Sequence, residues 1–235
     1  MNTYLIAGIK VNMSPCGRTK EQAEKYLTEY TQSPDIVIDI PDRVIDKACE
    51  ILKSDDREEG YYLASGFAFY RKLVDFNGFM LHSSAVCIGD SAYLFSGQSG
   101  IGKSTHTSLW QKLLGDKCKI LNDDKPAVRF ENGNAYVYGT PWSGKHDKSE
   151  NIRAKLCSVC FISRADTNSI MIMDKKTSAL NIISQCPKNF TEKQWDLVLS
   201  YIDALVNKVP VYKLMCNKDI SAAKLSYQTL TGGTL

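Results

Sequence analysis

Ten consecutive residues, SGQSGIGKST, combine glycines, a lysine and hydroxyl side chains directly after an apolar run. Within them, Gly97, Gly102, Lys103 and Ser104 complete the pattern G-x-x-x-x-G-K-[ST], which is typical of a phosphate-binding loop. Glycines let backbone N–H groups turn toward phosphate oxygens, and the start of a following helix adds its positive dipole end. The pattern predicts that this segment binds the phosphates of a nucleotide. The alternative is a glycine-rich turn with an incidental lysine.

The chemistry of a triphosphate assigns roles within this loop. Lys103 has a mobile full charge for the β- and γ-phosphates, and the Ser104 hydroxyl suits Mg²⁺, which prefers hard oxygen ligands. Nine residues are the predicted nucleotide contacts: Gly97, Gln98, Ser99, Gly100, Ile101, Gly102, Lys103, Ser104 and Thr105.

Two neighbouring acids, Asp123 and Asp124, follow the short apolar stretch that precedes Asn122. One carboxylate can hold Mg²⁺, with Asp123 as the predicted ligand, while the other accepts a proton from an attacking hydroxyl. Adjacent side chains on a strand point to opposite faces, so both acids can serve one site only if the backbone turns. Pro126 favours such a break. A solvated acidic turn is the alternative interpretation.

The elements around the loop do not alternate strand, helix, strand as in a doubly wound fold. Apolar patterning and turn residues instead predict a strand over 79–88, a hairpin turn at Gly89-Asp90, a strand over 91–95 and a helix over 106–114. A second hairpin pairs 127–130 with 135–138. The fold class predicted is therefore α/β, with a mixed sheet whose antiparallel hairpins flank the phosphate loop and its helix.

The remaining patterned segments divide the chain into residues 1–74, an α/β subregion packed on the core, and residues 75–235, the core that holds the loop. Strands are predicted over 3–13, 34–41, 159–163, 169–174 and 211–215, and helices over 42–54, 58–74 and 189–208.

Composition narrows the class of protein. The chain has 235 residues, 43% of them hydrophobic, and a net charge of +3 with both signs mixed, which favours neither nucleic acid nor a membrane as partner. Its first residues lack the pattern of a secretory signal, so we expect a cytoplasmic protein. Its eight scattered cysteines favour reduced, mostly buried thiols, and the C-x-x-C formed by Cys157 and Cys160 has no second pair for zinc.

The histidine of LHSSAV, the loop GQSGIGKST and the acids of NDDKP together resemble the HPr kinase/phosphorylase family, which is related in fold to ATP-dependent phosphoenolpyruvate carboxykinases. The resemblance spans roughly residues 81–145 and implies that the loop binds ATP and that Asp123 and Asp124 supply a metal ligand and a base. It also implies that His82 lies near the transferred phosphate, whereas a lone histidine is more often packed or solvated. Because relatives in this family form oligomers, the resemblance also allows this chain to form a homo-oligomer.

The segment from Gly139 to Lys145 is similar to the GxPWxGK of small kinase-like relatives with unassigned acceptors. We expect this loop to face the acceptor, with Trp142 and Lys145 as substrate contacts; a packed tryptophan beside a solvated lysine is equally open. Lys125 stands where the regulatory kinases of the family have arginine, and the later signature of the bifunctional enzymes is missing, which argues against phosphorolysis.

The sequence thus predicts a kinase that transfers phosphate from ATP to a hydroxyl acceptor, with serine or threonine of a peptide or protein foremost. A small-metabolite kinase and a nucleotide-gated switch or sensor remain alternatives. A GTPase switch is disfavoured because two of its usual motifs are missing. The sequence around Asp123 does not form D-x-x-G, and NKDI has isoleucine where the guanine motif N-K-x-D has aspartate. Decarboxylating carboxykinase chemistry requires further ligands that the sequence does not reveal.

Overall fold

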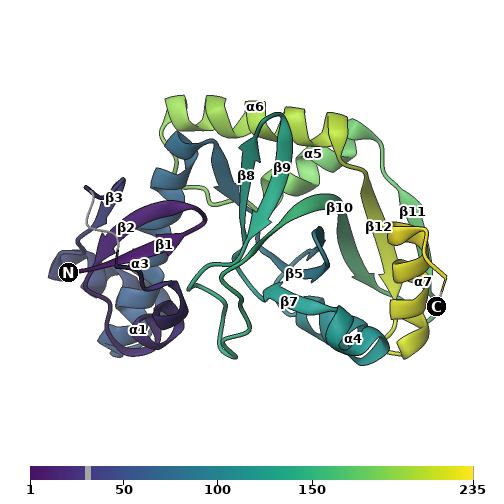
Figure 1. Ribbon diagram of the computed structural model, residues 1–235, viewed down its shortest axis with the longest axis horizontal. Coiled ribbons are helices and arrows are strands. Elements are labelled where there is room, and N and C mark those ends of the chain that lie inside the picture. Colours follow the sequence, from purple (N-terminus) through teal and green to yellow (C-terminus); the bar gives the residue numbers. More distant parts are fainter. Residues whose placement is uncertain (30–32, 235) are drawn as a thin grey trace.

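The structure is a computed structural model that describes residues 1–29 and 33–234. An N-terminal layer, drawn in purple and blue in Figure 1, holds a small sheet and its helices. Its elements are β1 (Asn2–Ile6), β2 (Ile9–Met13), α1 (Gly17–Ala23), η1 (Glu24–Tyr26), β3 (Ile36–Ile38), α2 (Asp42–Leu52), α3 (Arg57–Leu73) and η2 (Val74–Phe76).

The rest of the chain forms a larger sheet with helices on both faces (Figure 1). Its strands are β4 (Gly78–Met80), β5 (Ser83–Ile88), β6 (Ser91–Ser96), β7 (Lys119–Asn122), β8 (Ala127–Glu131), β9 (Asn134–Tyr138), β10 (Arg153–Arg164), β11 (Ser169–Ile172) and β12 (Val211–Cys216). Its helices are α4 (Lys103–Leu114), η3 (Gly115–Lys117), α5 (Lys175–Ser184), α6 (Glu192–Lys208) and α7 (Ile220–Thr231).

The predicted mixed sheet with antiparallel hairpins on both sides of the phosphate loop is confirmed. Strands β5 and β6 pair antiparallel across Gly89-Asp90, and β8 pairs with β9 across Asn132-Gly133. The long strand β10 joins these parts, because it runs parallel to β6 and β12 and antiparallel to β9. The path through the sheet is β4-β8-β9-β10-β6-β5-β7, and β12 carries β11 on its outer side.

Two long predicted strands are interrupted in the structure. The segment predicted as one strand over 3–13 is a hairpin, because Ala7 and Gly8 both adopt positive φ angles, of 52° and 73°, and reverse the chain. The segment predicted over 79–88 breaks at Leu81 and His82, where β4 pairs with β8 and β5 pairs with β6 and β7. That break leaves His82 outside the regular pairing of either strand.

The sheet separates two buried layers by simple alternation along its strands. In β6, Ala92 and Leu94 belong to the core under α5 and α6, while Tyr93 and Phe95 belong to the core under α4 and α7. The N-terminal layer has a third core, which Trp142 from the larger sheet's side joins. The phosphate loop therefore leaves β6 from the middle of a sheet that is packed on both faces.

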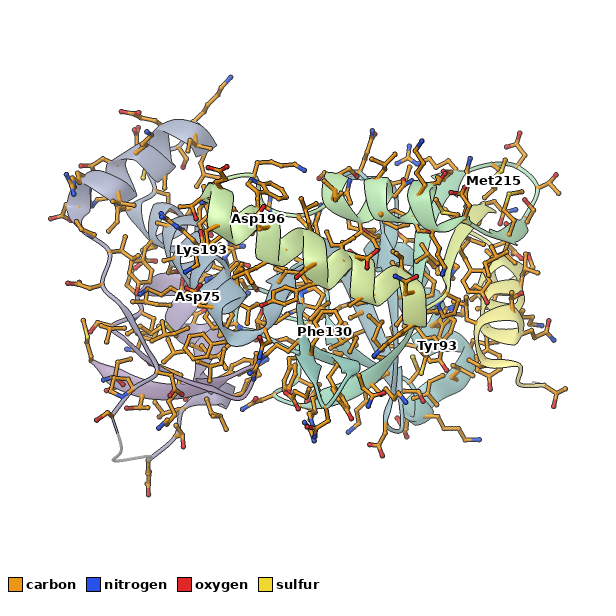
Figure 2. The ribbon with its side chains drawn as sticks, turned by 90° about the horizontal axis from the view of Figure 1, so that it is seen from above. Asp75, Tyr93, Phe130, Lys193, Asp196 and Met215 are labelled. Atoms are coloured by element: carbon orange, nitrogen blue, oxygen red, sulfur yellow. The ribbon has the colours of Figure 1, made fainter. Side chains whose placement is uncertain are left out.

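Helix α6 bridges the N-terminal layer and the larger sheet, as the view from above in Figure 2 shows, with Lys193 and Asp196 near Asp75 and Phe130 below the helix. The Tyr201 hydroxyl donates to the Val74 carbonyl oxygen at 3.1 Å, and the Gln194 amide donates to the Arg71 carbonyl oxygen at 2.9 Å. These bonds anchor the end of α3 and the start of η2 to α6.

His106 on α4 packs between Phe95 and Ser226, and burial lowers its pKa from 6.5 to about 4. The folded protein holds this ring neutral, whereas the unfolded chain takes up a proton below pH 6.5. We therefore expect the free energy of unfolding to be unaffected by this group above pH 6.5 and to fall by about 1 kcal/mol per pH unit below it, until the folded-state pKa is reached.

Urea denaturation between pH 7 and pH 5 measures this loss, and His106→Gln, which keeps a donor for Ser226, is the comparison. The slope attributable to His106 is absent from the variant, while the carboxylates contribute equally to both proteins. An equal slope in both proteins would contradict the assignment.

Candidate active site

The predicted phosphate loop connects β6 to α4 and ends at Gly102, whose φ of 119° few other residues adopt. The Lys103 ammonium lies over the loop and donates to the carbonyl oxygens of Gly97 and Gln98 at 3.1 and 3.2 Å. Lys103 is 7% exposed, and burial lowers its pKa despite the charges of Asp124 and Asp123, which raise it. A poorly hydrated ammonium therefore sits where a phosphate could replace the two carbonyl oxygens.

Asp123, the residue after β7, lies against α4, the helix that follows the loop. Its carboxylate accepts a hydrogen bond from the Ser84 hydroxyl, which also contacts the Thr107 hydroxyl at 2.8 Å. The Ser104 hydroxyl lies near enough to lower the pKa of Asp123. Asp123 is 7% exposed, and burial raises its pKa against these hydrogen bonds. The structure thus brings the two predicted metal ligands, Ser104 and Asp123, into contact.

This pair suits Mg²⁺ by its chemistry. Burial destabilises the charged form of the Asp123 carboxylate, and a nearby cation would stabilise it. Ser104 adds a neutral oxygen of the kind that Mg²⁺ accepts. Residues 1–29 and 33–234 contain no group of three or more His, Cys, Asp or Glu side chains that could hold a metal ion. Magnesium needs no such cluster, because it keeps several waters and takes oxygens from bound phosphates.

Asp124 faces a different set of partners from those of Asp123. One carboxylate oxygen lies 3.3 Å from His82 Nε2, and the other forms an ion pair with Lys125. Burial would raise the pKa of Asp124, but the His82 hydrogen bond and the Lys125 charge outweigh it and hold the pKa below its usual range. Asp124 is therefore ionised at neutral pH, and it lies beside the histidine that the resemblance placed near the transferred phosphate.

A turn built on Asn122 separates the two acids. Its side-chain oxygen accepts hydrogen bonds from the N–H groups of Asp124 and Lys125 at 3.0 and 2.8 Å, and its amide nitrogen donates to Thr140. This is an Asx turn, which mimics a backbone turn and reverses the chain directly after the strand. The turn that the two acids required therefore comes from Asn122, rather than from Pro126 alone.

The segment Gly139–Lys145 lies over this turn, between the N-terminal layer and α4 (Figure 1). The Gly144 N–H donates to the Tyr62 hydroxyl at 2.9 Å, and the Gly144 carbonyl oxygen accepts from Gln22 at 2.8 Å. A Cβ on Gly144, which has φ of 81°, would meet Asp124 Cβ at 3.2 Å. The loop therefore closes directly over the acid, held by α1 and α3.

The two predicted acceptor contacts in this segment differ in exposure. Trp142 is 0% exposed, stacks on Phe69 with ring centroids 5.0 Å apart, and donates to the Ser65 hydroxyl at 3.2 Å. Of the two interpretations of Trp142, the packed one fits this geometry, because the ring is fully buried. Lys145 is exposed and makes no ion pair with any described residue, so it remains available to a substrate.

A hollow of about 450 Å³ opens beside the loop, at the carboxyl ends of the parallel strands β6 and β10. In open α/β sheets, ligands bind at such strand ends. It is lined by Gly97, Gln98, Ile101, Phe161, Ile162, Ser163, Met173, Thr177, Asn181, Ser184, Gln185 and Lys213. The His82 N–H donates to the carbonyl oxygen of Gln185, one of these lining residues, at 3.1 Å.

Several side chains around the candidate site were not predicted from the sequence. Ser84 stands two residues after His82, and the alternation of β5 could have placed it on the α4 face, but a serine in an apolar strand indicates nothing by itself. Helix α5, which carries Thr177 and Asn181, was not predicted because its apolar spacing is weak. Tyr62 lies in the helix predicted over 58–74, and nothing in its spacing reveals the hydrogen bond to Gly144.

The cysteines fit the predicted reduced state, since every one of the eight is free. Cys160 is buried in the core under α4 and α7, and its neighbour in the C-x-x-C, Cys157, packs at the edge of the same core. Within the described parts of the chain, no helix combines the length and apolar character needed to cross a bilayer.

Comparison with known proteins adds a distant likeness of fold. No protein-family model matches the sequence, and no curated protein matches it either. Among solved structures, the chain is similar to the HPr(Ser) kinase/phosphatase from Coxiella burnetii, with 11% sequence identity and a TM-score of 0.36. The alignment covers 64% of this chain and 95% of that one, and a likeness this remote carries no functional argument.

Proposed function

We propose that the chain is an ATP- and Mg²⁺-dependent phosphotransferase that moves the γ-phosphate to a hydroxyl acceptor, with serine or threonine of a peptide or protein as the preferred class. The observation that carries the proposal is a pair of adjacent acids beside the phosphate loop that the turn at Asn122 directs to separate partners. Asp123 meets Ser104 at the loop helix, and Asp124 meets His82 across the turn from it. A switch that only binds and releases nucleotide does not need the second carboxylate.

The residues divide the work of the reaction as follows. Lys103 and the N–H groups of the loop hold the triphosphate, and the absence of a capping side chain at Gly102 leaves the first N–H groups of α4 for phosphate oxygens. Ser104 and Asp123 would hold Mg²⁺, which supplies positive charge to the β- and γ-phosphates. His82 and Lys125 keep Asp124 ionised and fix its orientation.

In the transfer step, the acceptor oxygen bonds to the γ-phosphorus as the bond from that phosphorus to the bridging oxygen breaks. The electron pair of the broken bond leaves with ADP, and the hydroxyl proton passes to Asp124. The lowered pKa keeps the carboxylate ionised, and the proton reaches it late, when the acceptor oxygen has begun to bond to phosphorus and has become acidic. Before that, the ionised carboxylate orients the hydroxyl by accepting its hydrogen bond.

The direct test incubates the protein with γ-labelled ATP and Mg²⁺ in the presence of peptide, protein and small-metabolite acceptor pools. We expect label in a hydroxyl-bearing acceptor, dependent on both ATP and Mg²⁺. Label in sugars or other metabolites, with none in polypeptides, would reassign the acceptor to the small-metabolite class. Phosphate release without any labelled acceptor, stimulated by a protein partner, would replace the kinase with the switch.

A further inference from the structure

A second opening in the structure lies on the N-terminal layer, between α2 and α3. This groove measures about 550 Å³, and its lining residues include Arg43, Val44, Lys47, Ile51, Phe67 and Arg71. Three of its apolar side chains are well exposed: Val44 by 40%, Ile51 by 65% and Phe67 by 37%. Apolar side chains that gather in an exposed groove mark a surface that another molecule covers.

The charges at the groove identify the chemistry of that molecule. Arg43, Lys47 and Arg71 are exposed and form no ion pair with any residue in the described ranges, although nearby Arg57 pairs with both Asp42 and Asp46. Asp39 is the one acidic side chain among the lining residues. An occupant that carries apolar side chains flanked by carboxylates would satisfy both the exposed apolar surface and the uncompensated positive charge.

The groove shares helix α3 with the surroundings of the candidate active site. Leu63 and Phe67 on α3 line the groove and, on their other side, a smaller hollow formed with Tyr62, Gly66, Tyr70, Met80, Lys125 and Trp142. Lys125 reaches from this hollow to Asp124 by its ion pair. A ligand that fills the groove and also presents a hydroxyl to Asp124 must extend along α3, which a polypeptide segment does and a small metabolite does not.

We propose that this groove docks a segment of the acceptor polypeptide in which apolar residues are flanked by Asp or Glu, while a serine or threonine elsewhere in the same polypeptide reaches Asp124. The inference rests on the proposed function for its second half, since it names the class of acceptor. Docking in the groove stands on the exposed apolar side chains and the unpaired positive charges, and peptide binding there can be measured without any phosphoryl transfer.

The test begins with a phage-displayed library of random twelve-residue peptides, selected on the full-length protein. We expect enrichment of sequences that combine apolar residues with Asp or Glu. Fluorescein-labelled synthetic copies of the enriched peptides then serve as probes in anisotropy titrations. The double variant Arg43→Glu/Lys47→Glu is expected to weaken their binding by at least tenfold, and Phe67→Ala to weaken it through loss of apolar contact.

Matched controls separate docking from general charge effects. Lys72→Glu alters an exposed lysine on α3 that does not line the groove, and it should leave peptide affinity within about twofold of the starting value, whereas Arg71→Glu next to it should not. Unchanged binding of fluorescent ADP with Mg²⁺ in all variants shows that they are folded. Peptides that bind the double variant as tightly as the unchanged protein, or a library without any enriched class, would overturn the proposal.

Two further results distinguish this inference from the proposed function. If serine-containing probes bind in the groove but receive no label from ATP, docking stands and the proposed acceptor class fails. If they receive label equally well from the unchanged protein and from the double variant, transfer stands and docking fails. A dimer in sedimentation that the double variant converts to monomer would assign the groove to a second copy of the chain instead and overturn the peptide proposal.

Discussion

An Asp124→Asn variant is expected to bind ATP and Mg²⁺ about as tightly as the unchanged protein but to transfer phosphate roughly 10²- to 10⁴-fold more slowly. The amide keeps the size of the side chain and can still accept a hydrogen bond, but it cannot take the acceptor proton. Asp124 makes its direct contacts with His82 and Lys125 and acts on Lys103 only through its charge, so the amide should leave the loop itself in place. Single-turnover transfer to the labelled acceptor, with ATP affinity measured by calorimetry, checks both halves of the expectation.

The neighbouring acid supplies the matched comparison for this variant. Asp123→Asn removes charge beside Ser104, so we expect it to weaken Mg²⁺-dependent nucleotide binding as well as transfer. Lys125→Gln removes one partner of Asp124 while leaving the carboxylate, and should slow transfer much less than Asp124→Asn. Full transfer by Asp124→Asn would remove Asp124 as the base, and full transfer by both acid variants would remove the division of roles between them.

The second large effect is expected from Lys103→Ala, with a loss of roughly 10²-fold or more in kcat/KM for ATP. The ammonium lies over the loop with its charge poorly hydrated, so a phosphate that takes the place of the Gly97 and Gln98 carbonyl oxygens gains a strong, charge-assisted contact. Alanine offers neither charge nor donor. Steady-state kinetics at varied ATP, together with nucleotide calorimetry, measures the loss.

Lys112→Ala on the same helix controls for changes in overall charge, since Lys112 is exposed and lies outside the loop. It should retain normal kinetics. Thermal melting of Lys103→Ala should remain close to that of the unchanged protein, because removing a buried ammonium relieves its desolvation at the same time as it removes two hydrogen bonds. A Lys103→Ala protein with normal affinity for ATP would contradict a phosphate-binding role for the loop.

The sequence predicted the parts of the fold whose signals are local. Gly89-Asp90 and Asn132-Gly133 specify tight turns through residues that accept positive φ, and the hairpins lie where these turns indicate. The reversal at Ala7 and Gly8 was missed, because alanine rarely adopts a positive φ and the flanking residues continue one apolar pattern. Local preference fails there because pairing of β1 with β2 overrides it.

The same distinction separates the predicted and unpredicted parts of the candidate site. The phosphate loop and the two acids could be predicted because each consists of consecutive residues whose types indicate their chemistry. The burial of Trp142 under Phe69 and the bond from Gly144 to Tyr62 join residues more than seventy positions apart, and no spacing rule reveals them. Helix α7 was also missed, since its small buried residues, Ala222, Ala223 and Ser226, give no strong apolar stripe.

The interlocking of the segment after β9 with α1 and α3 has a consequence for any attempt to cut this chain into pieces. A fragment that begins at residue 75 would leave Trp142 without Phe69 and Tyr70, and the backbone over Asp124 without Gln22 and Tyr62. The N-terminal layer is therefore needed to hold this segment in place. Shortened expression versions and domain grafts should carry them along with the nucleotide loop.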